Sequence, residues 1–434
     1  MIKKPIAPTP PMGWNSWDCY GGSVTEEEVR GNALYMAQHL KPFGWEYVVV
    51  DIQWYQPTMR SSSYIPYADL CMDGFGRLLP APNRFPSAAD GRGFAPLAAY
   101  VHSLGLKFGV HLMRGIPRRA VHDNLPIYGS RQRARDIAHP NLNCGWNTDM
   151  YGVDAQASGA YDYYKSVFDL FAQWGVDFVK IDDLCSTPNC FDVYAGAGEI
   201  ELYAKAAAEC GRDMVLSFSP GPAPVEQAEH LKRHGHMWRI TNDFWDTWDD
   251  MNIAFEACHR WQGVGEEHSW PDADMLPIGH ISLRGQERGV GERMTRLTPP
   301  EQYSLLSMWC LFRSPLMLGC ELRDLDPFTT GLITNREVLQ LLQTSRNARQ
   351  VLRRGMWDRH LVWMAECSNG GWYVALFNRD GQDSHMQVQT SQLGLPANLR
   401  LRDLWKREDV GQVQGSITVW VEPHGVKLYH VQEV

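Results

Sequence analysis

Residues 176–182 read VDFVKID, an apolar run that follows a helical segment and a glycine and ends in a carboxylate. Three other runs have the same design, because each is apolar and closes on aspartate: Tyr47–Asp51, Trp238–Asp243 and, more loosely, Ser269–Asp274. An α/β barrel carries its catalytic groups at the carboxyl ends of its strands. These runs therefore predict a barrel whose strand ends converge on an acidic pocket. Several carboxylates in one pocket point towards glycoside hydrolysis, which needs a pair of them in opposite protonation roles.

The sequence around these runs alternates between helical and strand patterns. Residues 25–28 form a capping box that predicts the start of a helix. Helical spacing is then followed by a glycine and a buried strand, which is typical of parallel βα units. Such helix and strand pairs are predicted at Phe94–Leu104 with Lys107–Leu112, Tyr161–Trp174 with Val176–Ile181, and Ile200–Cys210 with Met214–Phe218. With a first strand at Met12–Trp17 and a last at Leu316–Gly319, the total is about eight, which favours a (β/α)8 barrel over an open sheet.

The pattern changes after about residue 345. Short strands separated by turns are expected at Leu361–Glu366, Trp372–Asn378, Leu399–Leu404, Ile417–Val421 and Gly425–His430. The predicted fold class is thus α/β, with a (β/α)8 TIM barrel over residues 1–344 and a C-terminal antiparallel β-sandwich over residues 345–434. The segment Gln343–Arg349 is the expected junction.

Composition restricts the functional class and the location. The chain has 434 residues and a formal net charge of −9, which argues against nucleic acid and anionic membranes as partners. The first eleven residues lack the apolar region of a signal peptide, and no apolar run approaches the ~20 residues of a membrane span. The ten cysteines show no paired CxxC spacing. We therefore expect a cytoplasmic protein. Composition leaves open whether it forms a homo-oligomer.

Lys180 and Asp182 are the first candidates for chemistry. Side chains two residues apart on a strand point the same way, so both are expected at the barrel mouth. An ammonium group near a carboxylate lowers its pKa and keeps it ionised, which suits a nucleophile. The alternative is a salt bridge that only lines the barrel.

Arg239 and Asp243 are the second pair, and Asp272 with Asp274 the third. Arg239 can bind sugar hydroxyls, and Asp243 is a candidate general acid whose apolar wall Phe244 would supply. The alternatives are a helix N-cap for Asp243 and an Asx-turn for Asp272 and Asp274. His111 is a lone strand histidine, and calcium-loop spacing and nucleotide-binding motifs are missing. We expect no metal, no cofactor and a small carbohydrate or glycoside as the binding partner.

Several motifs in order along the chain resemble glycoside hydrolase family 27, the α-galactosidase family. They cover essentially the whole chain and read PMGWNSW at 11–17, YVVVD at 47–51, WGVDFVKID at 174–182, WRITND at 238–243, SWPDADML at 269–276, RSPL at 313–316 and NREV at 335–338. The resemblance implies a retaining mechanism with Asp182 as nucleophile and Asp243 as acid/base. It also implies that Trp17, Asp51, Lys180, Arg239 and Asp274 bind the sugar.

The chain departs from the family pattern at three places. The usual Asp-Asp-Cys-Trp after the second strand reads Asp51-Ile52-Gln53-Trp54, and Ile52 cannot hold the O6 hydroxyl of a galactoside. Family members described as β-L-arabinopyranosidases are similar in carrying isoleucine there. The family's strand-3 tyrosine is His111, which we therefore count among the substrate-binding residues with Ile52. Asp183-Leu184 replaces the cysteine that follows the nucleophile segment, so the family's frequent disulfide at that site is not expected.

The sequence therefore predicts a retaining exo-glycosidase for galactose-configured sugars. β-L-arabinopyranoside is the first choice of substrate because of Ile52, and α-D-galactoside is the close alternative. A carbohydrate-binding pseudoenzyme is the remote alternative.

Overall fold

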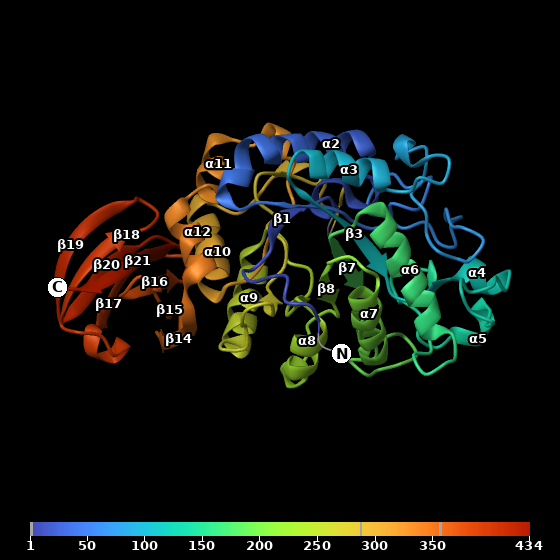
Figure 1. Cartoon of the computed structure of the whole chain (residues 1–434). Helices are drawn as coiled ribbons and strands as arrows, with labels where there is room; N and C mark the ends of the chain where they lie inside the picture. The colour runs from blue at the N-terminus through green and yellow to red at the C-terminus, as the bar shows by residue number, and fades with distance from the viewer. Residues whose placement is uncertain (1–2, 287–288, 356–357) are drawn as a thin grey trace.

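A computed structural model describes residues 3–286, 289–355 and 358–434 (Figure 1). Its first part is one sheet of eight strands, in the order β10-β9-β8-β7-β3-β2-β1-β13, and every pairing in it is parallel. The chain beyond β10 closes the barrel, because the Leu276 N–H donates to the Met317 carbonyl at 2.8 Å. The barrel strands are β1 (Met12–Asn15), β2 (Tyr47–Val50), β3 (Lys107–Met113), β7 (Phe178–Asp182), β8 (Val215–Ser219), β9 (Met237–Arg239), β10 (Trp270–Asp272) and β13 (Leu316–Leu318).

Helices follow these strands and lie around the outside of the sheet (Figure 1). The predicted capping box at Thr25 and Glu28 is present at the start of the second helix. Gly175 ends the helix before β7 with a left-handed φ of 82°, a conformation that favours glycine. The helices are α1 (Trp17–Tyr20), α2 (Glu26–Tyr35), α3 (Ala95–Ser103), α6 (Ala160–Trp174), α7 (Ala197–Glu209), α8 (Ala228–His234), α9 (Trp248–Trp261), α10 (Pro299–Phe312), α11 (Pro327–Ile333) and α12 (Arg336–Thr344).

Two of the excursions from the barrel form small sheets of their own. The longer one lies between β3 and α6 and forms a three-stranded sheet in the order β4-β6-β5. Its elements are β4 (Ile116–Pro117), α4 (Arg118–His122), α5 (Ala134–Ile137), β5 (Ala138–His139) and β6 (Met150–Val153). The shorter one lies between β10 and α10 and contains the antiparallel pair β11 (His280–Ile281) and β12 (Arg293–Met294).

The C-terminal part is an antiparallel sandwich. A six-stranded sheet in the order β14-β15-β16-β21-β18-β19 faces the two-stranded sheet of β17 and β20. Val362 and Met364 point into the core between these sheets, whereas Leu361 and Trp363 belong to the core shared with the barrel. The strands are β14 (Arg346–Arg354), β15 (His360–Glu366), β16 (Trp372–Asn378), β17 (Ser384–Gln389), β18 (Asn398–Asp403), β19 (Glu408–Gln414), β20 (Ser416–Val421) and β21 (Val426–Glu433).

The predicted fold class is confirmed, with differences in detail. The expected strand Trp238–Asp243 ends at Arg239, and the expected strand Ser269–Asp274 ends at Asp272, so Asp243 and Asp274 lie on loops. Strand β19 was not expected because nearly all of it is exposed, which leaves no alternation between apolar and polar residues. We propose residue 345 as the domain boundary, because α12 ends at Thr344 and β14 begins at Arg346. In the described ranges, no helix is long and apolar enough to cross a membrane.

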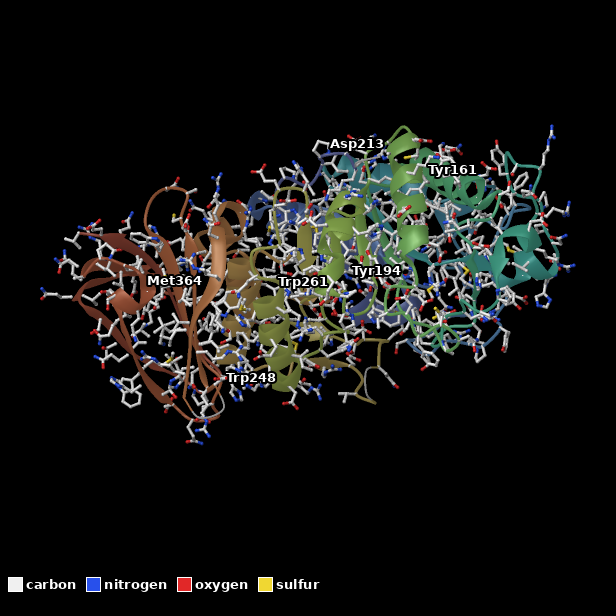
Figure 2. All side chains as sticks on the ribbon, turned by 90° about the horizontal axis from the view of Figure 1, so that it is seen from below. Tyr161, Tyr194, Asp213, Trp248, Trp261 and Met364 are labelled. Carbon is white, nitrogen blue, oxygen red and sulfur yellow. The ribbon has the colours of Figure 1, made fainter. Side chains whose placement is uncertain are left out.

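Apolar packing and ion pairs join the sandwich to α9 and α10. Trp248 on α9 stacks on His424, with ring centroids 4.1 Å apart, and Phe255 packs edge-on against Phe377. Glu256 on α9 pairs with both Arg353 (2.9 Å) and Arg379 (3.0 Å) of the sandwich. Figure 2 places Trp248 at this junction and Met364 within the sandwich.

Deleting the chain after residue 345 should therefore yield insoluble or unstable protein. The deletion would expose the apolar faces of α9 and α10, and an interface of this kind behaves as part of one folding unit. Sedimentation of the expressed fragment and its thermal unfolding, compared with the full chain, measure the effect. A soluble and fully active barrel would show that the two parts fold independently.

Candidate active site

One cavity of about 560 Å³ lies at the carboxyl ends of the barrel strands. It is built from residues that end or directly follow the strands, and from three loops beyond them. Its wall includes Trp17, Asp18, Asp51, Ile52, Ser62, Tyr64, Trp146, Lys180, Asp182, Asp183, Ser219, Arg239, Asn242, Asp243, Phe244, Trp245, Asp274 and Gln286. Of the sequence-predicted site residues, His111 and Asp272 are not on this wall.

Lys180 lies between two carboxylates at the closed end of the cavity. Its Nζ is 3.0 Å from Asp51 Oδ2 and 3.6 Å from Asp182 Oδ2, so the expected convergence of Lys180 and Asp182 is found. Asn15 also donates to Asp51, at 2.6 Å. Burial opposes the ionisation of Asp182, but the Lys180 ammonium and a hydrogen bond from His111 outweigh it and hold the pKa of Asp182 well below its usual range. Asp182 is therefore a carboxylate at neutral pH.

His111 lies behind Asp182 and not on the cavity wall. Its Nε2 is 2.8 Å from Asp182 Oδ2, and the imidazole is fully buried. Its Nδ1 has no hydrogen-bond partner among the described residues. A proton on Nδ1 would be a buried unsatisfied donor, so the neutral tautomer with hydrogen on Nε2 is favoured. The geometry assigns His111 to orienting Asp182, and its role in contacting sugar stays a prediction.

Asp51, His111 and Asp182 bring three possible metal ligands within 4.8 Å of one another, a cluster that the sequence spacing does not indicate. The Lys180 ammonium, however, already contacts both carboxylates of this set. It occupies the position from which a metal cation would neutralise them. The negative charges of these ligands are already balanced by the Lys180 side chain, so the three residues do not fit a resident metal ion.

Arg239 organises the opposite side of the cavity. It pairs with Asp243 at 3.0 Å and with Asp274 at 2.9 Å. The Asp243 side chain is 73% exposed, whereas Asp274 is buried and also accepts the Phe244 N–H at 2.7 Å. Burial, opposed by Arg239 and reinforced by the charges of Asp243 and Asp272, raises the pKa of Asp274 to about 7. The Asp274 N–H donates to Asp272 Oδ1, so the Asx-turn is present together with the arginine contact.

The loop that carries Asp243 is fixed by a second carboxylate. Asp246 is fully buried and pairs with Arg293 at 2.7 Å and Arg296 at 3.0 Å. Both arginines come from the excursion between β10 and α10. Burial opposes ionisation, but hydrogen bonds from the two arginines lower the pKa of Asp246 to about 2.

Sequence reasoning missed Asp18 and the ion pair at Asp183. Asp18 is buried on the cavity wall, and its Oδ2 has no hydrogen-bond partner among the described residues. Burial and the charge of Asp274 raise the pKa of Asp18 well above its usual value. Asp183 pairs with Arg114 at 2.7 Å, which links the ends of β3 and β7 where the family resemblance would have placed a cysteine.

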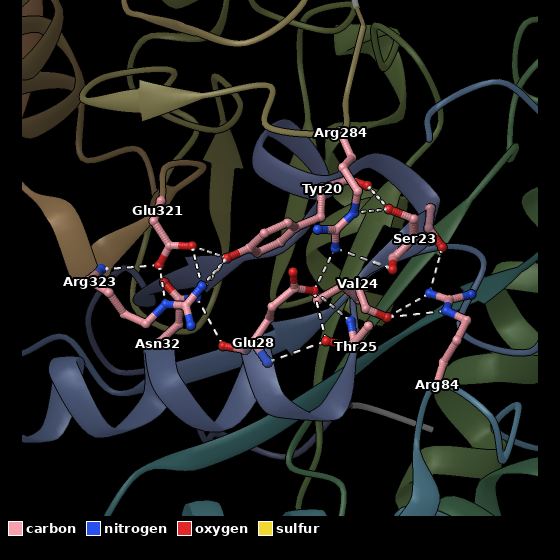
Figure 3. Close-up of polar contacts among 11 residues, drawn as sticks. Tyr20, Ser23, Val24, Thr25, Glu28, Asn32, Arg84, Arg284, Glu321 and Arg323 are labelled. Atoms are coloured by element: carbon pink, nitrogen blue, oxygen red, sulfur yellow. Dashed lines mark hydrogen bonds and ion pairs between the residues drawn. The ribbon is translucent and has the colours of Figure 1, made fainter. Parts of the chain in front are cut away.

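Helix α1, which contains Trp17 and Asp18, and the turn after it are held in place by the polar contacts drawn in Figure 3. The Tyr20 hydroxyl contacts Glu321 beyond β13. Arg284 pairs with Glu28 at 2.6 Å, and Arg84 donates to the backbone of the same turn. Three segments that are distant in sequence thus fix the position of the cavity wall next to β1.

A TIM barrel that brings an ionised, lysine-paired aspartate and an arginine-paired aspartate into one cavity has the groups that glycoside hydrolases use. The comparisons with known proteins agree. A family model described as alpha galactosidase A matches residues 122–344, and the alpha galactosidase C-terminal beta sandwich domain matches residues 358–431. Alpha-galactosidase 2 of Arabidopsis thaliana is 26% identical, with 99% of this chain and 91% of that protein covered.

Two solved structures are more similar. A variant of a GH27 β-L-arabinopyranosidase from Geobacillus stearothermophilus, solved with arabinose, is 51% identical with a TM-score of 0.96, covering 99% of this chain and 98% of that one. A Bacillus halodurans protein, provisionally named an alpha-N-acetylgalactosaminidase, is 46% identical with a TM-score of 0.88 and full coverage of both chains. The chain belongs to glycoside hydrolase family 27, and it is a glycoside hydrolase.

Replacing Asp246 by asparagine should destabilise the protein in a pH-dependent way. The folded pKa of Asp246, about 2, lies below the unfolded value of ~3.9, so its ionised form stabilises the fold fully above pH ~5 and less as the pH falls towards 2. We expect Asp246→Asn to lose about 1–2 kcal/mol of unfolding free energy at pH 7, since Arg296 is partly in solvent. Urea titrations at pH 7 and pH 3 measure the loss.

The loss should be smaller at pH 3 than at pH 7. Asp169→Asn, which breaks the surface pair with Lys165, is the matched control and should change little at either pH. A deficit in Asp246→Asn that is the same at both pH values would contradict the assigned role of the Asp246 charge.

Proposed function

We propose that this glycoside hydrolase is a retaining, exo-acting β-L-arabinopyranosidase that keeps some α-D-galactosidase activity. The observation that carries the proposal is Ile52, an apolar side chain on the cavity wall directly after Asp51. The sugars β-L-arabinopyranose and α-D-galactopyranose share ring stereochemistry and differ by the CH2OH at C5. An apolar wall at that position would leave the O6 hydroxyl of a galactoside without a partner, whereas arabinopyranose has no O6 hydroxyl. The 51% identical arabinopyranosidase supports this choice.

The mechanism follows from the unequal environments of the two aspartates. Asp182, held ionised by Lys180, attacks the anomeric carbon, while Asp243 protonates the leaving oxygen as the glycosidic bond breaks. Asp243 then removes a proton from water, which attacks the covalent intermediate and releases the sugar and the Asp182 carboxylate. Retention requires the two carboxyl groups to lie ~5–5.5 Å apart. Proton NMR of the first sugar anomer released tests the stereochemistry directly.

The remaining side chains would bind the sugar. Asp51, Lys180, Arg239 and Asp274 present charged hydrogen-bonding groups to its hydroxyls, and Trp17 presents an aromatic ring. The cavity is closed at the Asp51 end, which suits removal of a terminal residue. A small neutral glycoside is the expected partner, and the cytoplasmic location and the oligomeric state stay predictions.

A main activity on α-D-galactosides is the second candidate. It is favoured by the alpha-galactosidase relatives, such as Alpha-galactosidase 3 of Arabidopsis thaliana at 28% identity over 98% of this chain. The two candidates share every predicted catalytic residue, so only a side-by-side assay of the two nitrophenyl glycosides separates them.

Removing either carboxylate should give a distinct kinetic signature. Asp182→Ala should lower kcat by roughly 10³-fold or more, because covalent catalysis disappears, and azide or formate should partly restore it. Asp243→Ala should harm poor leaving groups far more than activated aryl glycosides, because only the former need protonation. Asp69→Ala, an exposed aspartate, is the control. Retention of more than about a tenth of wild-type turnover in Asp182→Ala would exclude it as the nucleophile.

Ile52→Asp should shift the ratio of kcat/KM values towards the galactoside. The new carboxylate can accept from O6, and with an arabinoside it would be desolvated without a partner. Ile52→Val, which stays apolar, should keep the wild-type ratio. An apolar pocket rejects an added hydroxyl only by about 10², so the wild-type enzyme should retain measurable galactosidase activity. A wild-type preference for the galactoside above tenfold, or an unchanged ratio in Ile52→Asp, would make α-galactosidase the better description.

A further inference from the structure

Three aromatic side chains form a continuous wall along one side of the cavity. Trp17 and Tyr64 are stacked, with ring centroids 6.0 Å apart and an interplanar angle of 16°. Tyr64 in turn contacts Trp146 at 5.3 Å and 44°. The three residues come from the start of α1, the loop after β2 and the excursion after β3, and all of them line the cavity. Different parts of the chain therefore supply one aromatic surface.

This aromatic wall runs from the closed end of the cavity to its mouth. At the closed end, Asp51 is buried and Asp182 is only 15% exposed. At the mouth, Asp243 is 73% exposed and Trp146 is 45% exposed. Tyr64, in the middle of the wall, lines the same cavity as the two predicted catalytic carboxylates Asp182 and Asp243.

Trp146 is held in place by a buried segment directly after it. Asp149 is buried and accepts hydrogen bonds from Gln53 (2.5 Å) and Tyr55 (2.9 Å), both on the loop after β2. The Asp149 N–H donates to Asn147, which is also buried. An exposed indole on a fixed base loses little conformational freedom when a ligand packs on it.

We propose that Trp146, backed by Tyr64, forms the binding site for the leaving group of the substrate. The inference rests on the proposed roles of Asp182 and Asp243. Because Asp243 protonates the leaving oxygen and lies at the mouth, the group attached to that oxygen must extend outward, beside Trp146. The ligand class is a ring with an apolar face, which is either a second sugar or an aryl group, since both pack on an indole.

The same site should bind acceptors for glycosyl transfer. An acceptor hydroxyl can replace water in the second step and attack the anomeric carbon of the covalent intermediate. The bond to Asp182 breaks, Asp182 leaves as a carboxylate, and the hydroxyl proton passes to Asp243. Trp146 would raise the share of this reaction by holding the acceptor ring at the mouth.

Trp146→Ala is the test, with Trp146→Phe as the conservative variant. A third variant, Trp420→Ala, removes a tryptophan that is 66% exposed on the sandwich and serves as the control. Three substrates with the same sugar are compared: a nitrophenyl glycoside, a disaccharide and the glycosyl fluoride, whose leaving group has no ring. The nitrophenyl glycoside and the disaccharide distinguish the aryl from the sugar source.

We expect Trp146→Ala to lose about three- to tenfold in kcat/KM on one or both ring-bearing substrates and nothing on the fluoride. The yield of transfer product with an added methyl glycoside acceptor should fall as well. Trp146→Phe should recover most of the loss, and Trp420→Ala should match wild type. An equal loss on the fluoride, or no loss on either ring-bearing substrate, would overturn the proposal.

The choice of sugar does not affect this comparison. If the enzyme prefers galactosides, the same three substrates are made with galactose, so failure of the proposed specificity is recognised separately from failure of the leaving-group site. Calorimetry with Asp182→Ala and Asp182→Ala/Trp146→Ala measures disaccharide binding without turnover. Equal affinities in these two proteins would also overturn the proposal.

Discussion

The contact of the Lys180 ammonium with Asp51 and Asp182 is the constraint on which the pocket depends. Two carboxylates that share a buried site cannot both ionise without a compensating cation. Lys180 extends from β7, so the barrel itself fixes the cation at 3.0 and 3.6 Å from the two acids. The position of the charge on Asp182, the predicted nucleophile, is therefore set by strand register.

The charge balance extends to the rest of the cavity. Arg239 forms ion pairs with Asp243 and Asp274, just as Lys180 contacts both Asp51 and Asp182. Burial raises the pKa of Asp18, whose Oδ2 has no hydrogen-bond partner among the described residues. The pKa of Asp274 is raised to about 7. The hydroxyls of a bound sugar would favour the ionised form of Asp274.

The sequence predicted correctly those parts of the fold and the site that depend on regular strand geometry. The alternation of helix, glycine and strand predicted the barrel, and the two-residue spacing of Lys180 and Asp182 predicted their convergence. Asp243 and Asp274 were found on loops because β9 and β10 are three residues long. Tyr64, Trp146 and Arg293 lie on irregular excursions, whose course no periodicity reports. His111 contacts Asp182 at 2.8 Å, a partner that its lone position in the strand did not indicate, and its contact with the sugar stays a prediction.

Asp182 and Asp243 differ in burial, and this difference suits Asp182 to the role of nucleophile and Asp243 to the role of acid in the proposed mechanism. A nucleophile has to be ionised before the substrate arrives, and Asp182 meets this condition through contacts within the barrel. An acid has to hold a proton only once the leaving oxygen is in place. Asp243 is largely in water in the free enzyme, so the sugar itself would remove that water and make the negative charge less favourable. In the proposed mechanism, contacts within the barrel keep the nucleophile ionised, and substrate binding removes water from around the acid.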